Sequence, residues 1–194
     1  MDKNYFTHKD LISKYSKVIV TGPHGAGNKI TAYIIDSDFE HLTHERWETE
    51  VYDATTLRDK LRSSDNYVSF HPSCSGFIHE VIEDLSDVLV IFMYKDITEI
   101  KNYRERNNIL QSIDDHEIPV YTNFLNNEIP HLDLNLERDG LEMVTYQSWE
   151  LYQKPLIPNY IEIEHSSLSM HEKWVPKIRR QDFKEWQTEI GEKP

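Results

Sequence analysis

The stretch Lys17–Ile35, KVIVTGPHGAGNKITAYII, decides the fold of this chain. Val18–Thr21 form a short β-branched run, which is the composition of a buried strand. The glycine-rich turn GPHGAG follows at residues 22–27, and apolar residues resume from Ile30 in a pattern compatible with a largely buried helix. Glycines let successive backbone N–H groups turn inward, and a helix N-terminus adds partial positive charge. A strand, a glycine turn and a helix in this order predict a phosphate-binding loop.

The loop departs from the usual pattern G-x-x-x-x-G-K-[ST]. Gly22 and Gly27 have the expected spacing. Asn28, however, stands at the lysine position, and Lys29 stands at the position of the serine or threonine. The magnesium-binding hydroxyl is therefore missing unless Thr31 replaces it. The alternative is a tight turn without a ligand, although three glycines after a first buried strand are costly without a use.

Length and composition indicate one domain over residues 1–194, with an N-terminal extension at 1–16 and a loop or insertion at 114–140. Mean hydropathy is −0.65, and no apolar run is long enough to span a membrane. The N-terminal residues lack the apolar core of a signal peptide. Cys74 is the single cysteine, which excludes an internal disulfide and a cysteine-rich zinc site. We therefore expect a cytoplasmic protein.

The net charge of −13 opposes indiscriminate binding to nucleic acid, because such binding depends on basic residues that contact phosphates. Positive charges do gather at Lys101–Arg106 and at Lys173–Arg180, so a local basic groove stays open as an alternative. Four Trp and eleven Tyr are many for this length. Core packing is the preferred interpretation for most of them, and stacking on bases is the alternative.

Strands and helices are predicted to alternate along the chain. The further predicted strands are 67–70, 88–94 and 160–164, with a short one around 41–43. The further predicted helices are 54–63, 75–85, 97–113 and 143–153. The segment 88–94, VLVIFMY, is apolar without alternation, which is typical of a strand buried on both faces of a parallel sheet. The alternation predicts an α/β fold of three layers, with a mainly parallel sheet flanked by helices.

Ligands of such folds bind at the carboxyl ends of the strands. That rule selects the glycine loop, the pair His71 and Pro72, and the pair Lys95 and Asp96. We predict that His71 and Pro72 contact the substrate, with a hydrogen-bonded structural histidine as the alternative. Asp96 either orients a basic partner or caps the following helix, and capping is preferred.

Five stretches match a set of family motifs, namely Gly22–Thr31 (GPHGAGNKIT), Phe70–Cys74 (FHPSC), Met93–Ile100 (MYKDITEI), Trp149–Lys154 (WELYQK) and Ser167–His171 (SLSMH). Together they resemble the P-loop kinases of bacteriophages, including enzymes that phosphorylate 5-hydroxymethyluracil bases in DNA. The resemblance implies a P-loop NTPase-like fold, with ATP and Mg²⁺ as cofactors. It also implies transfer of the γ-phosphate to a hydroxymethyl-pyrimidine, in DNA or as a nucleotide.

The chain departs from these motifs in the loop, where Gly25 and Ala26 replace an arginine and a serine. The family's loop also resembles that of sulfotransferases, which bind a sulfonucleotide there. Two further hypotheses therefore stand beside the kinase: a sulfotransferase-like enzyme, and a degenerate P-loop protein that binds a nucleotide without catalysis. The late lysine and the missing hydroxyl favour the last of these.

Phosphoryl transfer mainly requires positioning and charge neutralisation. The residues expected to hold the nucleotide are Gly22, Pro23, His24, Gly25, Ala26, Gly27, Asn28, Lys29, Ile30 and Arg104. Lys29 is the predicted cation of the loop, with a surface lysine as the alternative. Thr31 either contacts magnesium or packs in the core, and packing is preferred.

Three acids follow the expected loop helix, and a hydroxyl acceptor requires a carboxylate base. Glu45 is the predicted general base, because we expect it beyond the next strand on the acceptor side. Asp36 is assigned to acceptor binding, and Asp38 is the third candidate. The alternative for each acid is a solvated charge.

Two arginines lie on the predicted helix 97–113, which corresponds to a lid in a kinase of this size. Arg106 is predicted to stabilise transition-state charge on the γ-phosphate. For Arg104 the alternative is a salt-bridged helix face with Glu99 and Glu105. The ten histidines show no metal-ligand spacing, so no dedicated metal site is predicted.

Overall fold

The computed structural model describes residues 2–43, 54–107, 118–119, 121–123, 125–126 and 132–174. Within these ranges the strands are β1 (Lys17–Thr21), β2 (Tyr67–Phe70), β3 (Val88–Tyr94) and β4 (Tyr160–Glu164). They form one parallel sheet in the order β2-β1-β3-β4. β1 lies inside this sheet and leads through the glycine loop into α2 (Asn28–Asp38). The predicted fold class, an α/β arrangement with a parallel sheet flanked by helices, is confirmed.

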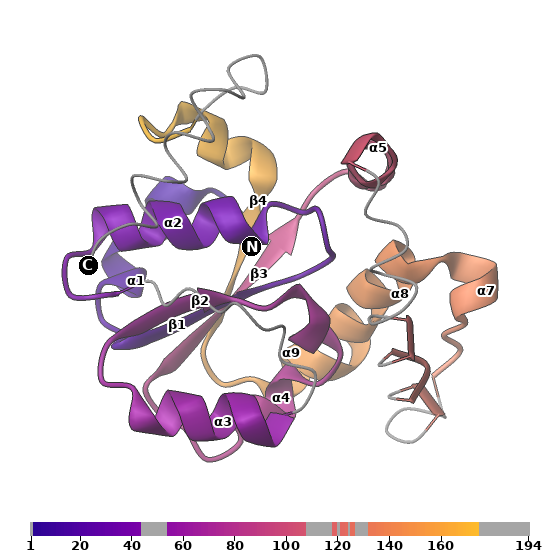
Figure 1. Ribbon diagram of the computed structural model, residues 1–194, viewed down its shortest axis with the longest axis horizontal. Helices are drawn as coiled ribbons and strands as arrows, with labels where there is room; N and C mark the ends of the chain where they lie inside the picture. The colour runs from indigo at the N-terminus through magenta and orange to yellow at the C-terminus, as the bar shows by residue number, and fades with distance from the viewer. Residues whose placement is uncertain are drawn as a thin grey trace.

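Helices cover both faces of the sheet (Figure 1). One face carries η1 (Tyr5–His8), α1 (Lys9–Ile12), α2 and η4 (His165–Met170). The other face carries α3 (Ala54–Ser63), α4 (Ile78–Ile82) and the helical segment that begins with α8 (Leu141–Ser148). The described part of the chain therefore has the three predicted layers.

β3 is buried on both faces, as its uninterrupted apolar run predicts. Leu89, Ile91 and Met93 belong to the core on the α2 side. Val90 and Phe92 belong to the core on the α3 side. Each of these five side chains is fully buried, because helices cover the strand above and below.

Most predicted elements have the expected bounds, and those predicted at 75–85, 41–43 and 143–153 differ. The helix predicted at 75–85 is broken into η2 (Pro72–Gly76) and α4, because Phe77 between them has a non-helical backbone with φ −137°. The strand predicted around 41–43 is wrong: these residues are not in a strand, although the Thr43 carbonyl accepts a hydrogen bond from Val68 N at 3.1 Å. The helix predicted at 97–113 is confirmed as α5 (Ile97–Asn107). Its predicted end at 113 lies outside the described residues.

The helix predicted at 143–153 begins earlier and changes its winding. α8 is followed by the π-helical turn η3 (Trp149–Gln153) and by α9 (Lys154–Leu156). Pro155 in α9 has no N–H to donate to the preceding turn, which explains the wider turn before it. A short helix, α7 (Leu136–Asp139), lies within the segment 114–140 predicted as a loop or insertion.

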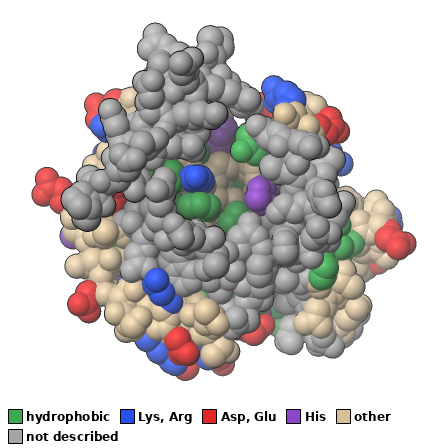
Figure 2. Space-filling view, viewed as in Figure 1, with side chains coloured by type: hydrophobic (Ala, Val, Ile, Leu, Met, Phe, Trp, Pro, Cys, Tyr) green, Lys and Arg blue, Asp and Glu red, His purple; other side chains and the backbone are tan. Residues whose placement is uncertain are grey.

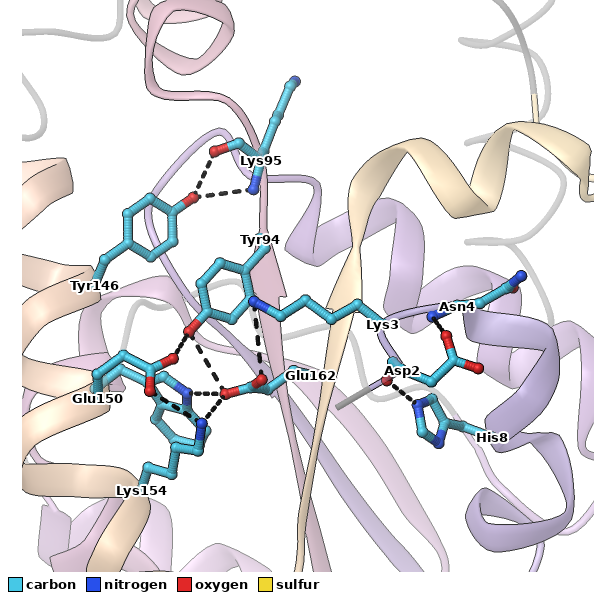
Figure 3. Close-up of polar contacts among 11 residues, drawn as sticks. Asp2, Lys3, Asn4, His8, Tyr94, Lys95, Tyr146, Glu150, Lys154 and Glu162 are labelled. Carbon is cyan, nitrogen blue, oxygen red and sulfur yellow. Dashed lines mark hydrogen bonds and ion pairs between the residues drawn. The ribbon is translucent and has the colours of Figure 1, made fainter.

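A buried charge cluster joins β4 to the N-terminal segment and to η3 (Figure 3). Glu162, which is 2% exposed, accepts hydrogen bonds from Trp149 Nε1 at 3.0 Å and pairs with Lys154 Nζ at 2.8 Å. Lys3 Nζ lies 3.8 Å from the same carboxylate and 3.1 Å from the centroid of the Tyr94 ring. The charge of Glu162 is thus matched by lysines from two distant parts of the chain.

No helix in the described ranges combines the length and the apolar character needed to cross a membrane.

Candidate functional site

The candidate site lies at the edge of the sheet where the parallel strands end. The segment directly after β1 is the glycine loop, 22–27. His71 follows β2, Lys95 follows β3 and His165 follows β4. Figure 2, drawn from the same side as Figure 1, shows a hollow near the middle of the molecule. Basic, His and apolar side chains are visible in this hollow. Charged, titratable and apolar groups therefore meet on this face.

The three loop glycines are required by geometry, because each has a positive φ: 134° at Gly22, 95° at Gly25 and 99° at Gly27. A Cβ on Gly22 would lie 2.9 Å from the Met93 carbonyl oxygen of β3. A Cβ on Gly27 would lie 2.3 Å from Cδ2 of His165. The loop is thus pressed against two neighbouring strand ends.

The tip of the loop is a tight turn. Ala26 N donates to the Pro23 carbonyl at 2.9 Å, and Gly25, with its positive φ, is the third residue of this turn. This is the position at which a type II turn requires glycine. In such a turn the peptide between His24 and Gly25 is the one whose orientation defines the turn type.

Asn28, at the position of the usual lysine, braces the loop. Its Nδ2 donates to the carbonyls of Gly22 at 3.3 Å and Pro23 at 3.0 Å, and the residue is 3% exposed. Its Oδ1 has no hydrogen-bond partner among the described residues. The side chain faces carbonyl oxygens, so its contribution to phosphate binding is to hold the loop rather than to supply charge.

Two buried cations hold the next two carbonyls of the loop. Arg104 Nε donates to the His24 carbonyl at 3.0 Å, and Lys95 Nζ donates to the Gly25 carbonyl at 3.3 Å. Arg104 also forms a buried ion pair with Glu142 of α8, at 2.7 Å. Arg104 is therefore at the predicted nucleotide loop, and its salt bridge is with Glu142 rather than with Glu99 or Glu105.

Lys95 is the loop contact that sequence reasoning missed. Its strand-end position selected it, but nothing in the sequence indicates that its side chain turns toward the loop. The Tyr146 hydroxyl donates to the Lys95 carbonyl at 2.8 Å and accepts from Lys95 N at 3.0 Å, as Figure 3 shows. Burial raises the pKa of Tyr146 to about 12, so its hydroxyl stays protonated at neutral pH.

The contacts fix which way the loop peptides face. The peptide bonds of the described chain are trans, and a trans peptide directs its C=O and N–H to opposite sides. Because the His24 carbonyl faces Arg104, the N–H of Gly25 faces away from Arg104. The N-terminus of α2, with its partial positive charge, begins three residues later. This arrangement suits the binding of an anion such as a phosphate.

The other residues predicted around the loop lie apart from its carbonyls. Lys29 is exposed, and its Nζ is 5.7 Å from the centroid of the Tyr33 ring. Ile30 is partly buried and packs against the core on the α2 side. Thr31 is fully buried, with Oγ1 at 2.9 Å from the Gly27 carbonyl and 3.3 Å from Met93 Sδ. Packing, the preferred interpretation of Thr31, is confirmed.

Two predicted catalytic or substrate residues are not brought to the loop by the structure. Asp36 was expected after the loop helix, and this is wrong: it lies in the last turn of α2. Eight residues separate it from Asn28, which is about 12 Å along a helix. Arg106 is exposed, and its Nε donates to the Asn102 carbonyl of its own helix at 2.8 Å. Glu45 lies outside the described residues.

Asp38 was also expected after the helix, and it too lies in the last turn of α2. It is bound there to Tyr5, Lys9 and His171. The far end of α2 therefore uses its second acid to hold neighbouring segments together.

His71 and Pro72 lie beside the end of β1. His71 N donates to the Val20 carbonyl at 2.9 Å, and the His71 carbonyl accepts from Thr21 Oγ1 at 2.8 Å. The His71 side chain is buried. Asp96 caps α5, because its Oδ1 accepts from Glu99 N at 3.1 Å, as the preferred interpretation predicts.

Among the described residues, no group of three or more His, Cys, Asp or Glu is arranged to hold a metal ion. Thr31 cannot supply a hydroxyl to magnesium in this conformation, since its Oγ1 is directed to Gly27 and Met93. The direction of the Gly25 amide and the N-terminus of α2 suit an anion, but the described loop residues offer no magnesium ligand of their own.

Comparisons with known proteins return little. No protein-family model and no curated protein matches the chain. One solved structure that resembles it is shikimate kinase from Acinetobacter baumannii in complex with shikimate, at 10% sequence identity and a TM-score of 0.41. The likeness covers 95% of this chain and 98% of that chain. At this level, it says nothing about the ligand or the activity of the present protein.

Proposed function

We propose that this chain is a P-loop phosphotransferase that binds ATP at the loop 22–27 and at the N-terminus of α2. One observation carries the proposal. The loop carbonyls are tied back by Asn28, Arg104 and Lys95, so the Gly25 amide faces away from Arg104, three residues before the N-terminus of α2. A loop held in this way is preformed for a phosphate.

The reaction we propose moves the γ-phosphate of ATP to a hydroxyl of a 5-hydroxymethyl-pyrimidine, in phage DNA or as a nucleotide. The acceptor rests on the resemblance of the sequence motifs alone, and it implies a protein of the host cytoplasm. Bound Mg²⁺ would neutralise charge on the phosphates. Glu45 is proposed to take the proton of the acceptor hydroxyl, and Lys29, an exposed residue of the first turn of α2, to neutralise charge on the γ-phosphate.

A second candidate function is nucleotide binding without transfer. Two features of the loop favour it. The side chain of Asn28 donates to loop carbonyls at the place of a phosphate-binding lysine. The hydroxyl of Thr31, the candidate replacement for the missing magnesium ligand, is buried and donates to the Gly27 carbonyl.

A binding measurement tests both candidates first. We expect ATP with Mg²⁺, at a hundredfold excess over its Kd, to raise the melting temperature by about 5 °C or more. A sulfonucleotide that stabilises the protein while ATP does not would favour the sulfotransferase-like alternative. If neither nucleotide is bound, the proposed function is wrong.

Turnover separates the two candidates. With radiolabelled ATP, we expect label on DNA or nucleotides that carry 5-hydroxymethyl-pyrimidine and none on unmodified controls. Glu45→Gln is expected to lower turnover about 100-fold. Glu40→Gln, at an exposed position near the end of α2, is the matched control and should leave turnover unchanged. Binding of ATP without turnover on any of these acceptors would leave the non-catalytic function.

A further inference from the structure

The β3–α5 segment supplies two cations to consecutive peptides of the loop. Lys95 follows β3 and Arg104 lies in α5, and their side chains are each 4% exposed. Arg104 binds the carbonyl of His24, and Lys95 binds the carbonyl of Gly25. In Figure 1, α5 stands beyond the carboxyl end of β3.

These contacts place positive charge behind the loop. Each cation binds the oxygen end of a trans peptide. The N–H of Gly25 faces away from Arg104, whereas the N–H of Ala26, on the peptide that Lys95 binds, donates to the Pro23 carbonyl within the turn. A donor on a carbonyl also polarises that peptide and strengthens its N–H as a donor. Since both side chains are buried, solvent screens their charge less than it would at the surface. An anion beside the Gly25 amide would feel that polarised peptide and the charges behind the loop. The charge of Arg104 is offset by Glu142 at 2.7 Å. Lys95 Nζ lies farther from the carboxylate of Glu99, at 4.0 Å.

The contacts also explain how the loop works without a lysine at residue 28. Asn28 holds the first two carbonyls of the loop and brings no charge. The next two carbonyls are held by Lys95 and Arg104, which pair with Glu99 at 4.0 Å and with Glu142 at 2.7 Å, respectively. The positive charge nearest the loop therefore does not come from residue 28, the first residue of α2, but from the segment that follows β3.

We propose that Lys95 is a positioning residue for nucleotide polyphosphate: it fixes the Gly25 peptide and supplies, from behind the loop, positive charge that a G-K-[ST] loop takes from its own lysine. This inference rests on the proposed function and concerns the same site. Arg104 acts in the same way on the His24 peptide. Lys95 is the residue to test, because a change at Arg104 would also leave the buried carboxylate of Glu142 without its ion-pair partner.

The test compares Lys95→Met, which keeps the length of the side chain, with Lys95→Arg, which keeps the charge. Lys101→Met is the matched control, since Lys101 is an exposed lysine of α5 and its loss changes the net charge equally. Kd values for ATP, ADP and AMP with Mg²⁺, and for inorganic tripolyphosphate, are measured by titration calorimetry. The melting temperature without ligand is recorded for every variant.

We expect Lys95→Met to weaken the binding of ATP and tripolyphosphate at least tenfold. The loss of affinity should be smaller for ADP and smallest for AMP, because the effect follows the charge of the ligand. Lys95→Arg should recover most of the affinity, and Lys101→Met should bind like the wild type. Tyr146→Phe is a second variant in case Lys95→Met does not fold. It removes the two hydrogen bonds between the Tyr146 hydroxyl and the Lys95 backbone without removing charge. It should weaken the binding of ATP several-fold and the binding of AMP less.

Three results would overturn the inference while the proposed function stands: unchanged ATP binding by Lys95→Met, an equal loss for all four ligands, or no recovery in Lys95→Arg. For a Lys95→Met chain that does not fold, unchanged ATP binding by Tyr146→Phe has the same meaning. If the wild type binds none of the ligands, the proposed function fails and the inference fails with it.

Discussion

Asn28 determines the shape of the loop at the scale of a single residue. The side-chain amide of Asn28 donates to the carbonyls of Gly22 and Pro23 and so holds the loop together from inside. An uncharged side chain therefore stands where the usual loop has a lysine. The brace requires an N–H₂ group at this position. An oxygen there would face the carbonyls of Gly22 and Pro23 without a proton between them.

Asn28→Asp tests this brace with a substitution of nearly equal shape. We expect it to lower the free energy of unfolding by about 3 kcal/mol, because it removes two hydrogen bonds and buries a carboxylate against carbonyl oxygens. Asn4→Asp is the control: Asn4 caps η1 through Oδ1, which accepts from Phe6 N at 3.1 Å, and Asp provides the same acceptor. Chemical denaturation of both variants is the measurement. Equal stability of the two variants would contradict the role of Asn28.

Gly22→Ala tests the close approach of the loop to β3. The added Cβ would lie 2.9 Å from the Met93 carbonyl oxygen, and alanine would have to adopt φ 134°. We expect a loss of about 2 to 4 kcal/mol in the free energy of unfolding. Gly76→Ala is the comparison, since its Cβ would lie 3.3 Å from a Tyr121 side-chain atom and its backbone is not left-handed. A loss at Gly22 no larger than at Gly76 would show that the loop is free to shift.

At the scale of elements, one ion pair joins the loop to two helices. Arg104 of α5 binds the His24 carbonyl with Nε and Glu142 of α8 with Nη1, and both side chains are buried. A shift of α8 relative to α5 would therefore move the donor that fixes the turn of the loop.

Glu142→Gln is expected to destabilise the protein by about 3 kcal/mol, because it leaves the guanidinium of Arg104 buried without a counter-charge. Asp84→Asn removes the partner of Arg62 from an exposed pair at 3.1 Å and should cost less than about 1 kcal/mol. Thermal and urea unfolding of the two variants measure the difference. Similar small losses in both would mean that the link between α5 and α8 carries little energy.

At the scale of the whole molecule, Asp38 joins the two ends of the described chain. It accepts from Tyr5 Oη at 2.6 Å and lies 3.1 Å from both Lys9 Nζ and His171 Nε2. Burial acts to raise the pKa of Asp38, but the hydrogen bonds from Tyr5, His171 and Lys9 together outweigh burial and lower it. The contacts of Asp38 therefore stabilise the fold in its ionised form.

Because the pKa of Asp38 is lowered in the folded protein, we expect the free energy of unfolding to fall as the solution becomes acidic. The stabilisation is fully present above the unfolded-state pKa of about 3.9 and is lost as the pH falls through the lower folded-state value. Asp38→Asn should reduce the free energy of unfolding at pH 7 by about 1 to 3 kcal/mol, and the difference from the wild type should shrink below about pH 4. Asp59→Asn, an exposed change on α3, should follow the wild-type curve. A difference that stays constant to pH 2 would contradict this prediction.

The sequence by itself determined the layers and the place of the site. The run at 88–94 predicts a strand buried on both faces, and the glycine spacing after the first strand predicts a loop at its carboxyl end. Both predictions depend only on neighbouring residues. An apolar strand without alternation must be buried on both faces, and glycines at suitable spacing indicate a turn without reference to distant parts of the chain. The same local rules predicted the cap at Asp96.

Only the tertiary structure decided which side chains meet the loop. Lys95 and Arg104 come from the next strand and helix, Glu142 lies 38 residues beyond Arg104, and the sequence carries no periodicity that pairs them. Asp36 lies within α2 and not after it, because the bounds of α2 depend on packing and the helix continues through Asp36 to Asp38. Long-range contacts of this kind are set by how the layers pack, so local patterns predict the loop but not the cations that hold it.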